Sequence, residues 1–180
     1  MLIIKSRPEF TSGRLYIYLE EVNFQSRFMR LFKRLILFSF FAILAILISF
    51  AVYARNCSYN VDVAVKHLRK NAQPKPVRLC AGYVRQAITA GGVPTFIRPP
   101  MASWYLWYLP MIGFGQVDVD NLSTYTPQKG DLVVFGSTSR HPYGHIAMYD
   151  GNQWISDFKQ RSIFVYKNND SSWGVFRRNP

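Results

Sequence analysis

A run of hydrophobic residues near the N-terminus dominates the pattern of the chain. Residues 35–54 are 20 consecutive residues without a charged side chain. A helix of this length spans the hydrocarbon layer of a bilayer. We therefore predict three parts: a basic segment over 1–34, a transmembrane helix or signal-peptide core over 35–54, and a folded domain over 55–180.

The charges beside this run predict its orientation. Arg27, Arg30, Lys33 and Arg34 precede the run, whereas a lone Arg55 follows it. The positive-inside rule then places the N-terminus in the cytoplasm and the folded domain on the outer side of the membrane. The basic segment itself has a partial apolar and polar alternation over 14–22, which leaves a short strand or no regular structure open.

A cleaved signal peptide is the alternative to a membrane anchor. Translation from Met29 would give a basic start, an apolar core and a small-residue cleavage site with Val52 and Ala54 at the critical positions. Either interpretation exports the same domain.

Two stretches after residue 59 have hydrophobic residues at helical spacing. In the first, over 60–72, Asn60 is a suitable N-cap and Pro74 follows the end. In the second, over 79–92, Cys80 lies in the first turn and two glycines end the helix. The residues expected to face inward are Val61, Ala64, Val65, Leu68 and Ala72 in the first helix, and Cys80, Val84, Ala87 and Ile88 in the second. A short aromatic helix is predicted over 102–109.

The second half of the chain has the pattern of short strands joined by tight turns. LVVF at 132–135 is a buried run, and GHIAMY at 144–149 and QWISDF at 153–158 flank an Asp-Gly-Asn turn. SIFVY at 162–166 and WGVFRR at 173–178 follow as further strands. Helices followed by an antiparallel sheet predict an α+β domain.

Composition and charge narrow the class of protein. Of the 180 residues, 49% are hydrophobic and 18% are charged, which excludes disorder as the main state. Two cysteines, with no Cys-x-x-Cys or His-Glu-x-x-His motif, argue against a structural metal site, and we expect no cofactor. The region 55–180 carries 15 basic and 7 acidic residues, so it suits a polyanionic surface.

Cys80 is the candidate nucleophile. A thiol at a helix N-terminus lies near free N–H groups and the positive end of the helix dipole, which favour the thiolate. His145 is the candidate base, because a loop over 150–152 would pair Tyr149 with Gln153 and place His145 opposite Asp157. Asp157 would then accept a hydrogen bond from the imidazole and fix its tautomer.

That register also assigns the faces of the hairpin. One face would carry His145, Ala147, Tyr149, Ile155 and Asp157, and the helix of Cys80 would dock there. The other two histidines, His67 and His141, are expected to be solvated. Asp131, after Gly130, is expected to shape a turn rather than to catalyse.

Four segments together resemble a known family. CAGYVRQAI, PQKGDLVVF, GHIAMYDGNQWISDFKQ and WGVFRR are similar to the CHAP and NlpC/P60 superfamily of papain-like cell-wall cysteine peptidases and amidases. The closest likeness is to small CHAP-like amidases of Gram-negative bacteria, including interbacterial amidase effectors, and it covers nearly all of residues 60–178. The resemblance implies Cys80 as nucleophile, His145 as base and Asp157 as the orienting residue.

The resemblance also implies a function and partners. A cysteine hydrolase would cut an amide bond in peptidoglycan, either the muramoyl–alanine bond or a bond of the stem peptide. Its partners would be stem peptides, the membrane through 35–54, and an immunity or inhibitor protein, with no nucleic acid. The catalytic domain would lie in the periplasm, anchored to the inner membrane or free after signal cleavage.

The chain departs from this family in two places. CHAP domains often carry a Gln just before the nucleophile, where this chain has Arg78 and Leu79, so a backbone N–H of the first helical turn would have to hold the oxyanion. Amidase effectors are usually injected without an export signal, whereas this chain has a hydrophobic segment.

Each assignment leaves an alternative open. Cys80 could be an inert core residue or form a disulfide with Cys57. His145 could be purely structural, and Asn152 or Gln160 could take the place of Asp157. A non-catalytic wall-binding domain and a Cys-His acyltransferase are the competing functions. The aromatic residues Trp104, Tyr105, Trp107 and Tyr108 could line a groove or belong to the core.

Overall fold

The structure is a computed structural model that describes residues 12–166 and 171–178, and the side chains of residues 12–27 lie outside the description. It divides into two compact units, Met1–Ile48 and Ser49–Pro180. The predicted boundaries at residues 34 and 54 remain predictions.

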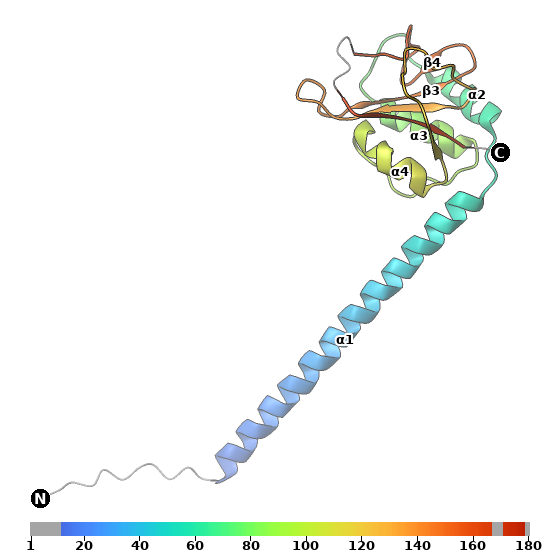
Figure 1. Ribbon diagram of the computed structural model, residues 1–180. Helices are drawn as coiled ribbons and strands as arrows, with labels where there is room; N and C mark the ends of the chain where they lie inside the picture. Colours follow the sequence, from blue (N-terminus) through green and yellow to red (C-terminus); the bar gives the residue numbers. More distant parts are fainter. Residues whose placement is uncertain (1–11, 167–170, 179–180) are drawn as a thin grey trace, which may run out of the picture. The chain divides into compact units, whose positions relative to one another are not determined.

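Helix α1 runs from Ser12 to Asn56 (Figure 1). Its segment Phe28–Asn56 is long and apolar enough to cross a membrane, and its most apolar stretch is not buried by the rest of the chain. The expectation of a short strand or no structure over 14–22 is wrong, because these residues belong to α1. Leu15 to Leu19 are all apolar or aromatic, so the alternation is incomplete and its period does not separate strand from helix.

The second unit is an α+β domain, as predicted. Its helices are α2 (Val61–Asn71), α3 (Cys80–Ala90), the 3-10 turn η1 (Ala102–Trp104) and α4 (Tyr105–Met111). Its strands are β1 (Gly115–Val117), β2 (Leu132–Phe135), β3 (His145–Tyr149), β4 (Trp154–Ile155) and β5 (Trp173–Arg177). They form one antiparallel sheet in the order β1-β5-β2-β3-β4.

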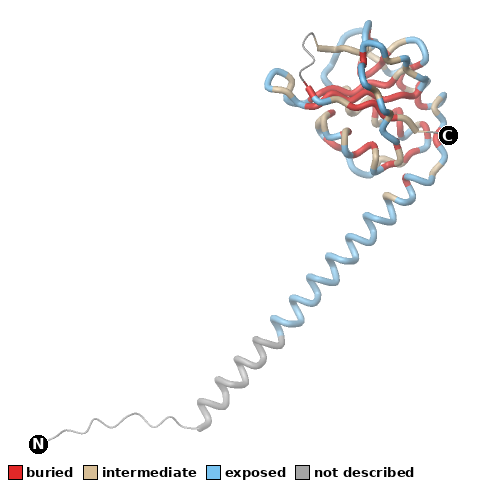
Figure 2. The backbone as a smooth tube through the Cα atoms, viewed as in Figure 1, coloured by how far each residue is buried: buried red, intermediate tan, exposed pale blue. Residues whose placement is uncertain are grey.

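Both faces of the central strands are covered, which Figure 2 shows as continuous buried segments through the sheet. On one face, α2, α3 and α4 pack on Leu132, Val134, Ile146 and Met148. On the other face, Val133, Phe135, Ala147 and Val175 pack against loop residues. The expected inward faces of the two helices are confirmed by Ala64, Val65 and Leu68 in α2 and by Val84, Ala87 and Ile88 in α3, which are buried.

Asn60 caps α2 as predicted, because its side-chain oxygen accepts a hydrogen bond from the N–H of Val63. The aromatic helix is confirmed by η1 and α4. Strand β1 has no counterpart among the predicted strands, and the expected strand over 162–166 is irregular.

The predicted register of the β3–β4 hairpin is wrong by one residue. Tyr149 pairs with Trp154 rather than with Gln153, and Met148 pairs with Ile155. Since a one-residue shift exchanges the two faces of a strand, α3 packs on the face of Ile146 and Met148, not on that of Ala147.

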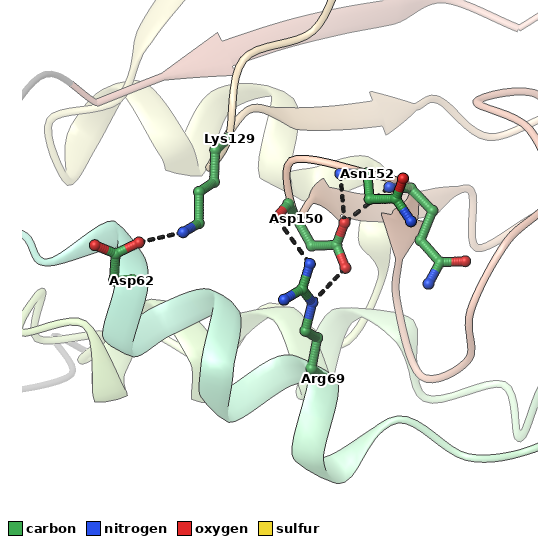
Figure 3. Close-up of polar contacts among 6 residues, drawn as sticks. Asp62, Arg69, Lys129, Asp150 and Asn152 are labelled. Atoms are coloured by element: carbon green, nitrogen blue, oxygen red, sulfur yellow. Dashed lines mark hydrogen bonds and ion pairs between the residues drawn. The ribbon is translucent and has the colours of Figure 1, made fainter.

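The side chain of Asp150 explains this register. Its Oδ1 accepts hydrogen bonds from the N–H groups of Asn152 and Gln153, so the turn closes one residue later than predicted (Figure 3). Arg69 of α2 holds the same carboxylate through an Nε–Oδ2 contact of 2.5 Å, and burial of the carboxylate is more than offset, so that the pKa of Asp150 is lowered. A second ion pair, between Lys129 and Asp62, lies nearby in Figure 3.

Asp131 shapes a turn, as predicted. Its buried carboxylate accepts hydrogen bonds from the hydroxyl of Tyr125 and the N–H of Gln128, both at 2.6 Å. It also forms a two-point ion pair with the guanidinium of Arg177 on β5. These contacts join the loop before β2 to the neighbouring strand.

Candidate active site

A cleft of about 900 Å³ opens where the start of α3 meets the start of β3. Cys80, His145 and Asp157 all line it, so the fold brings the three predicted site residues to one place. They come from three different segments: the first turn of α3, the first residue of β3, and the chain just after β4.

Cys80 is half-buried at the N-terminal end of α3. No side chain caps this end of the helix, so the N–H groups of its first turn remain available to a ligand. Burial raises the pKa of the thiol and the charge of Asp157 raises it further, while the N–H groups of Ile146 and Ala81 act in the opposite direction. The thiol is therefore protonated at neutral pH and needs a base to become a nucleophile.

His145 supplies an imidazole at the same end of the cleft. The N–H of Ile146, the next residue, is the backbone group that acts most strongly on the thiol, which places the sulfur beside the start of β3. Burial lowers the pKa of His145 to about 4, against the opposing charge of Asp157. The imidazole is therefore neutral at pH 7, as a general base must be.

Gly144 fixes the position of His145. Its φ of +67° lies in the left-handed region. A Cβ at this residue would lie 2.3 Å from the carbonyl oxygen of Phe135. Only glycine fits such a close approach, which gives the Gly-His pair of the sequence a physical reason.

Gln160 is the hydrogen-bond partner of His145. Its amide nitrogen lies 2.6 Å from Nε2 of the imidazole and 3.0 Å from Oγ of Ser156. Both Gln160 and His145 are buried. The sequence offered Gln160 only as a substitute for Asp157, because no strand register connects it to His145.

Asp157 has different hydrogen-bond partners from those predicted. Its Oδ2 accepts the N–H groups of Val77 at 2.7 Å and Leu79 at 3.2 Å, and its Oδ1 accepts the hydroxyl of Ser156 at 3.0 Å. Among the residues that the structure describes, no hydrogen bond joins Asp157 to His145. The carboxylate acts on the imidazole through its charge and holds the segment that leads into α3.

Aromatic rings close one side of the cleft. Tyr166 stacks on His141 with ring centroids 3.7 Å apart, meets His145 edge-on at 6.2 Å, and donates a hydrogen bond to the carbonyl of Gly144. The expectation that His141 is solvated is wrong, because this stacking leaves the ring half-buried in the cleft wall. His67 is half-buried as well, with a buried Nε2.

The remaining alternatives divide between the core and the surface. Cys57 and Cys80 are both free, so the structure contains no disulfide between them. Tyr105 and Tyr108 belong to the core, whereas Trp104 and Trp107 are exposed outside the lining of this cleft.

Two solved structures resemble this chain. Both are of the type VI effector–immunity complex Tae3-Tai3 from Ralstonia pickettii. The native form is 34% identical, with a TM-score of 0.59, over 67% of this chain and 100% of the matched chain. The selenomethionine form is 34% identical, with a TM-score of 0.55, over 63% and 98%. No family model matches the chain, and no curated protein does.

Proposed function

We propose, on the premise that this chain belongs to the family of the type VI effector Tae3, that it is a cysteine hydrolase acting on an amide bond of bacterial peptidoglycan. The observation that carries the proposal is the cleft in which a thiol at a helix N-terminus and a neutral imidazole lie together. That pair is the machinery of nucleophilic acyl transfer.

In the proposed reaction, His145 takes the proton of the Cys80 thiol as the sulfur attacks the carbonyl carbon. The C–S bond forms, and the oxyanion is held by free N–H groups of the first turn of α3. The C–N bond then breaks, and the imidazolium gives its proton to the leaving amine. Water attacks the thioester with His145 again as base, which releases a carboxylate and restores the thiol.

Gln160 and Asp157 assist this chemistry in different ways. We assign the amide oxygen of Gln160 to the Nε2–H of His145, because the two amide atoms are exchangeable by a flip and Gln160 Oε1 is otherwise buried without a partner among the described residues. Nδ1 is then left to accept the thiol proton. Asp157 stabilises the imidazolium by its charge, so the predicted triad becomes a four-residue group.

The N-terminal helix and an immunity protein complete the proposal. Residues 35–54 would anchor the enzyme in the inner membrane or act as a signal, with the catalytic unit in the periplasm. Membership of the Tae3 family supports a cognate immunity protein as a partner.

The test is digestion of intact sacculi by the full-length chain, reduced and in detergent, beside Cys80→Ala and Cys57→Ser variants. We expect new termini, identified by mass spectrometry, from the wild type and from Cys57→Ser but not from Cys80→Ala. The bond that yields these termini is the substrate bond. A folded, reduced wild type that releases no new termini would refute the hydrolase.

A further inference from the structure

The lining of the cleft carries an excess of positive charge. Four arginines line it: Arg78, Arg85, Arg98 and Arg140. Asp157 is the one carboxylate among the lining residues. Both of its oxygens already accept hydrogen bonds from Val77, Leu79 and Ser156. The cleft therefore contains much more positive than negative charge.

These guanidinium groups have no ion-pair partner within the described part of the chain. The ion pairs found there use Arg69, Lys129 and Arg177, all outside the cleft. A guanidinium has five N–H donors arranged to match a carboxylate at two points. Four of them around one nucleophile form a site prepared for an anionic ligand.

Arg78 adds a second, independent observation. It is the one non-glycine residue among those described with a positive φ, +64°. An ordinary side chain in this region costs roughly 1–2 kcal/mol, which glycine would avoid. The strain is maintained by Asp157, since Oδ2 accepts the N–H groups on both sides of Arg78.

A strained turn that a buried carboxylate holds in place, two residues before the nucleophile, presents its side chain to the cleft. Strain of this kind persists where the surroundings over-determine it, and it concentrates at binding sites. A glycine at residue 78 would make the turn easier to form, but it would remove one guanidinium from the site.

From these observations we propose that the arginines of the cleft bind free carboxylates on either side of the scissile amide, so that the substrate is an acidic peptide with at least two carboxylates. This inference rests on the proposed function and specifies its substrate class. The enzyme would then distinguish stem peptides with free carboxylates from those whose carboxylates are amidated.

The test measures binding separately from turnover. The full-length Cys80→Ala chain in detergent is titrated with the tetrapeptide Ala-γ-Glu-diaminopimelate-Ala in its free-acid form and with its carboxyls amidated. We expect at least tenfold tighter binding of the free acid, with the difference shrinking as salt is added. Equal affinity for the two peptides would overturn the proposal.

Matched variants assign the effect to the cleft. Arg98→Gln and Arg140→Gln should each weaken binding of the free acid about tenfold and leave the amidated peptide unchanged. Arg161→Gln removes an exposed guanidinium outside the cleft lining and should change neither affinity. An equal loss in Arg161→Gln would mean that overall charge, not the cleft, attracts the peptide, and would also overturn the proposal.

Arg78→Gly separates binding from stability. It should weaken binding of the free acid while leaving the melting temperature unchanged or higher, because it relieves the left-handed strain. Unchanged affinity in this variant would remove Arg78 from the site. If wild-type enzyme fails to digest sacculi while Cys80→Ala still prefers the free acid, the hydrolase is refuted and the carboxylate site stands.

Discussion

The amide nitrogen of Gln160 lies 2.6 Å from Nε2 of His145, with both side chains buried. This contact occupies the ring nitrogen that does not face the nucleophile in the proposed reaction. A fixed tautomer follows if the amide oxygen accepts the Nε2 proton, and the pair then does what the sequence assigned to Asp157.

Gln160→Leu should lower kcat by roughly 10²-fold with KM nearly unchanged, because the imidazole loses the group that orients it rather than a contact with substrate. Steady-state kinetics on a soluble peptide substrate measure both constants. Gln160→Glu should retain much of the activity and move the acid limb of the pH–rate profile upward, since a carboxylate beside the ring favours the imidazolium. An acid limb that stays in place in Gln160→Glu would contradict the assignment.

Asp157→Ala should destabilise the domain by roughly 2–3 kcal/mol, because the N–H groups of Val77 and Leu79 lose a charged acceptor. Asp157→Asn keeps an acceptor oxygen and should cost less. Denaturant unfolding of the two variants gives the comparison. If Asp157→Ala is as stable as the wild type, then Asp157 does not hold the segment before α3.

The sequence predicted the helix of Cys80 well, because its inward residues recur at helical spacing and local glycines end it. It placed His145 and Asp157 in one cleft for an incorrect geometric reason. The register depends on Asp150, whose carboxylate binds Arg69 of α2, 81 residues earlier in the chain. No local pattern encodes a contact over that separation.

Arg78 and Gln160 were beyond prediction for related reasons. Local preference assigns a left-handed residue to glycine or asparagine, so an arginine there is determined by Asp157 from a distant segment. Gln160 reaches His145 because the chain leaves β4 after Ile155 and turns back, where the N–H of Gln160 binds the carbonyl of Trp154. The irregular path breaks the period on which sequence reasoning depends.

Alkylation of Cys80 by iodoacetamide should become fast only at high pH in a His145→Ala, Cys57→Ser background. Burial raises the pKa of the thiol above its ordinary value of 9.0, so the midpoint of the rate against pH should lie above 9. Mass spectrometry of the modified peptide measures the rate. A midpoint below 8 would show a thiolate stabilised by the helix end without help from the imidazole.

The stability of the domain should fall as pH decreases from about 6.5 to about 4. The pKa of His145 is lowered from 6.5 to about 4 by burial, so the unfolded chain binds a proton in this range that the folded chain does not. The loss from this group approaches about 3 kcal/mol. Urea unfolding at pH 7 and pH 4.5 should show a smaller difference in His145→Gln than in the wild type. An equal difference in the two proteins would mean that His145 is not the group responsible.

Gly144→Ala should destabilise the domain and lower activity together. The new Cβ would lie 2.3 Å from the carbonyl oxygen of Phe135, in a left-handed conformation that costs roughly 1–2 kcal/mol before any clash is counted. Relief of that clash must move His145, the next residue. Gly82→Ala is the matched stability control, because nothing lies within 4 Å of its added Cβ and alanine favours a helix by roughly 1 kcal/mol. Thermal unfolding should therefore show a lower melting temperature for Gly144→Ala and an unchanged or higher one for Gly82→Ala, and a stable, active Gly144→Ala would contradict the close packing around His145.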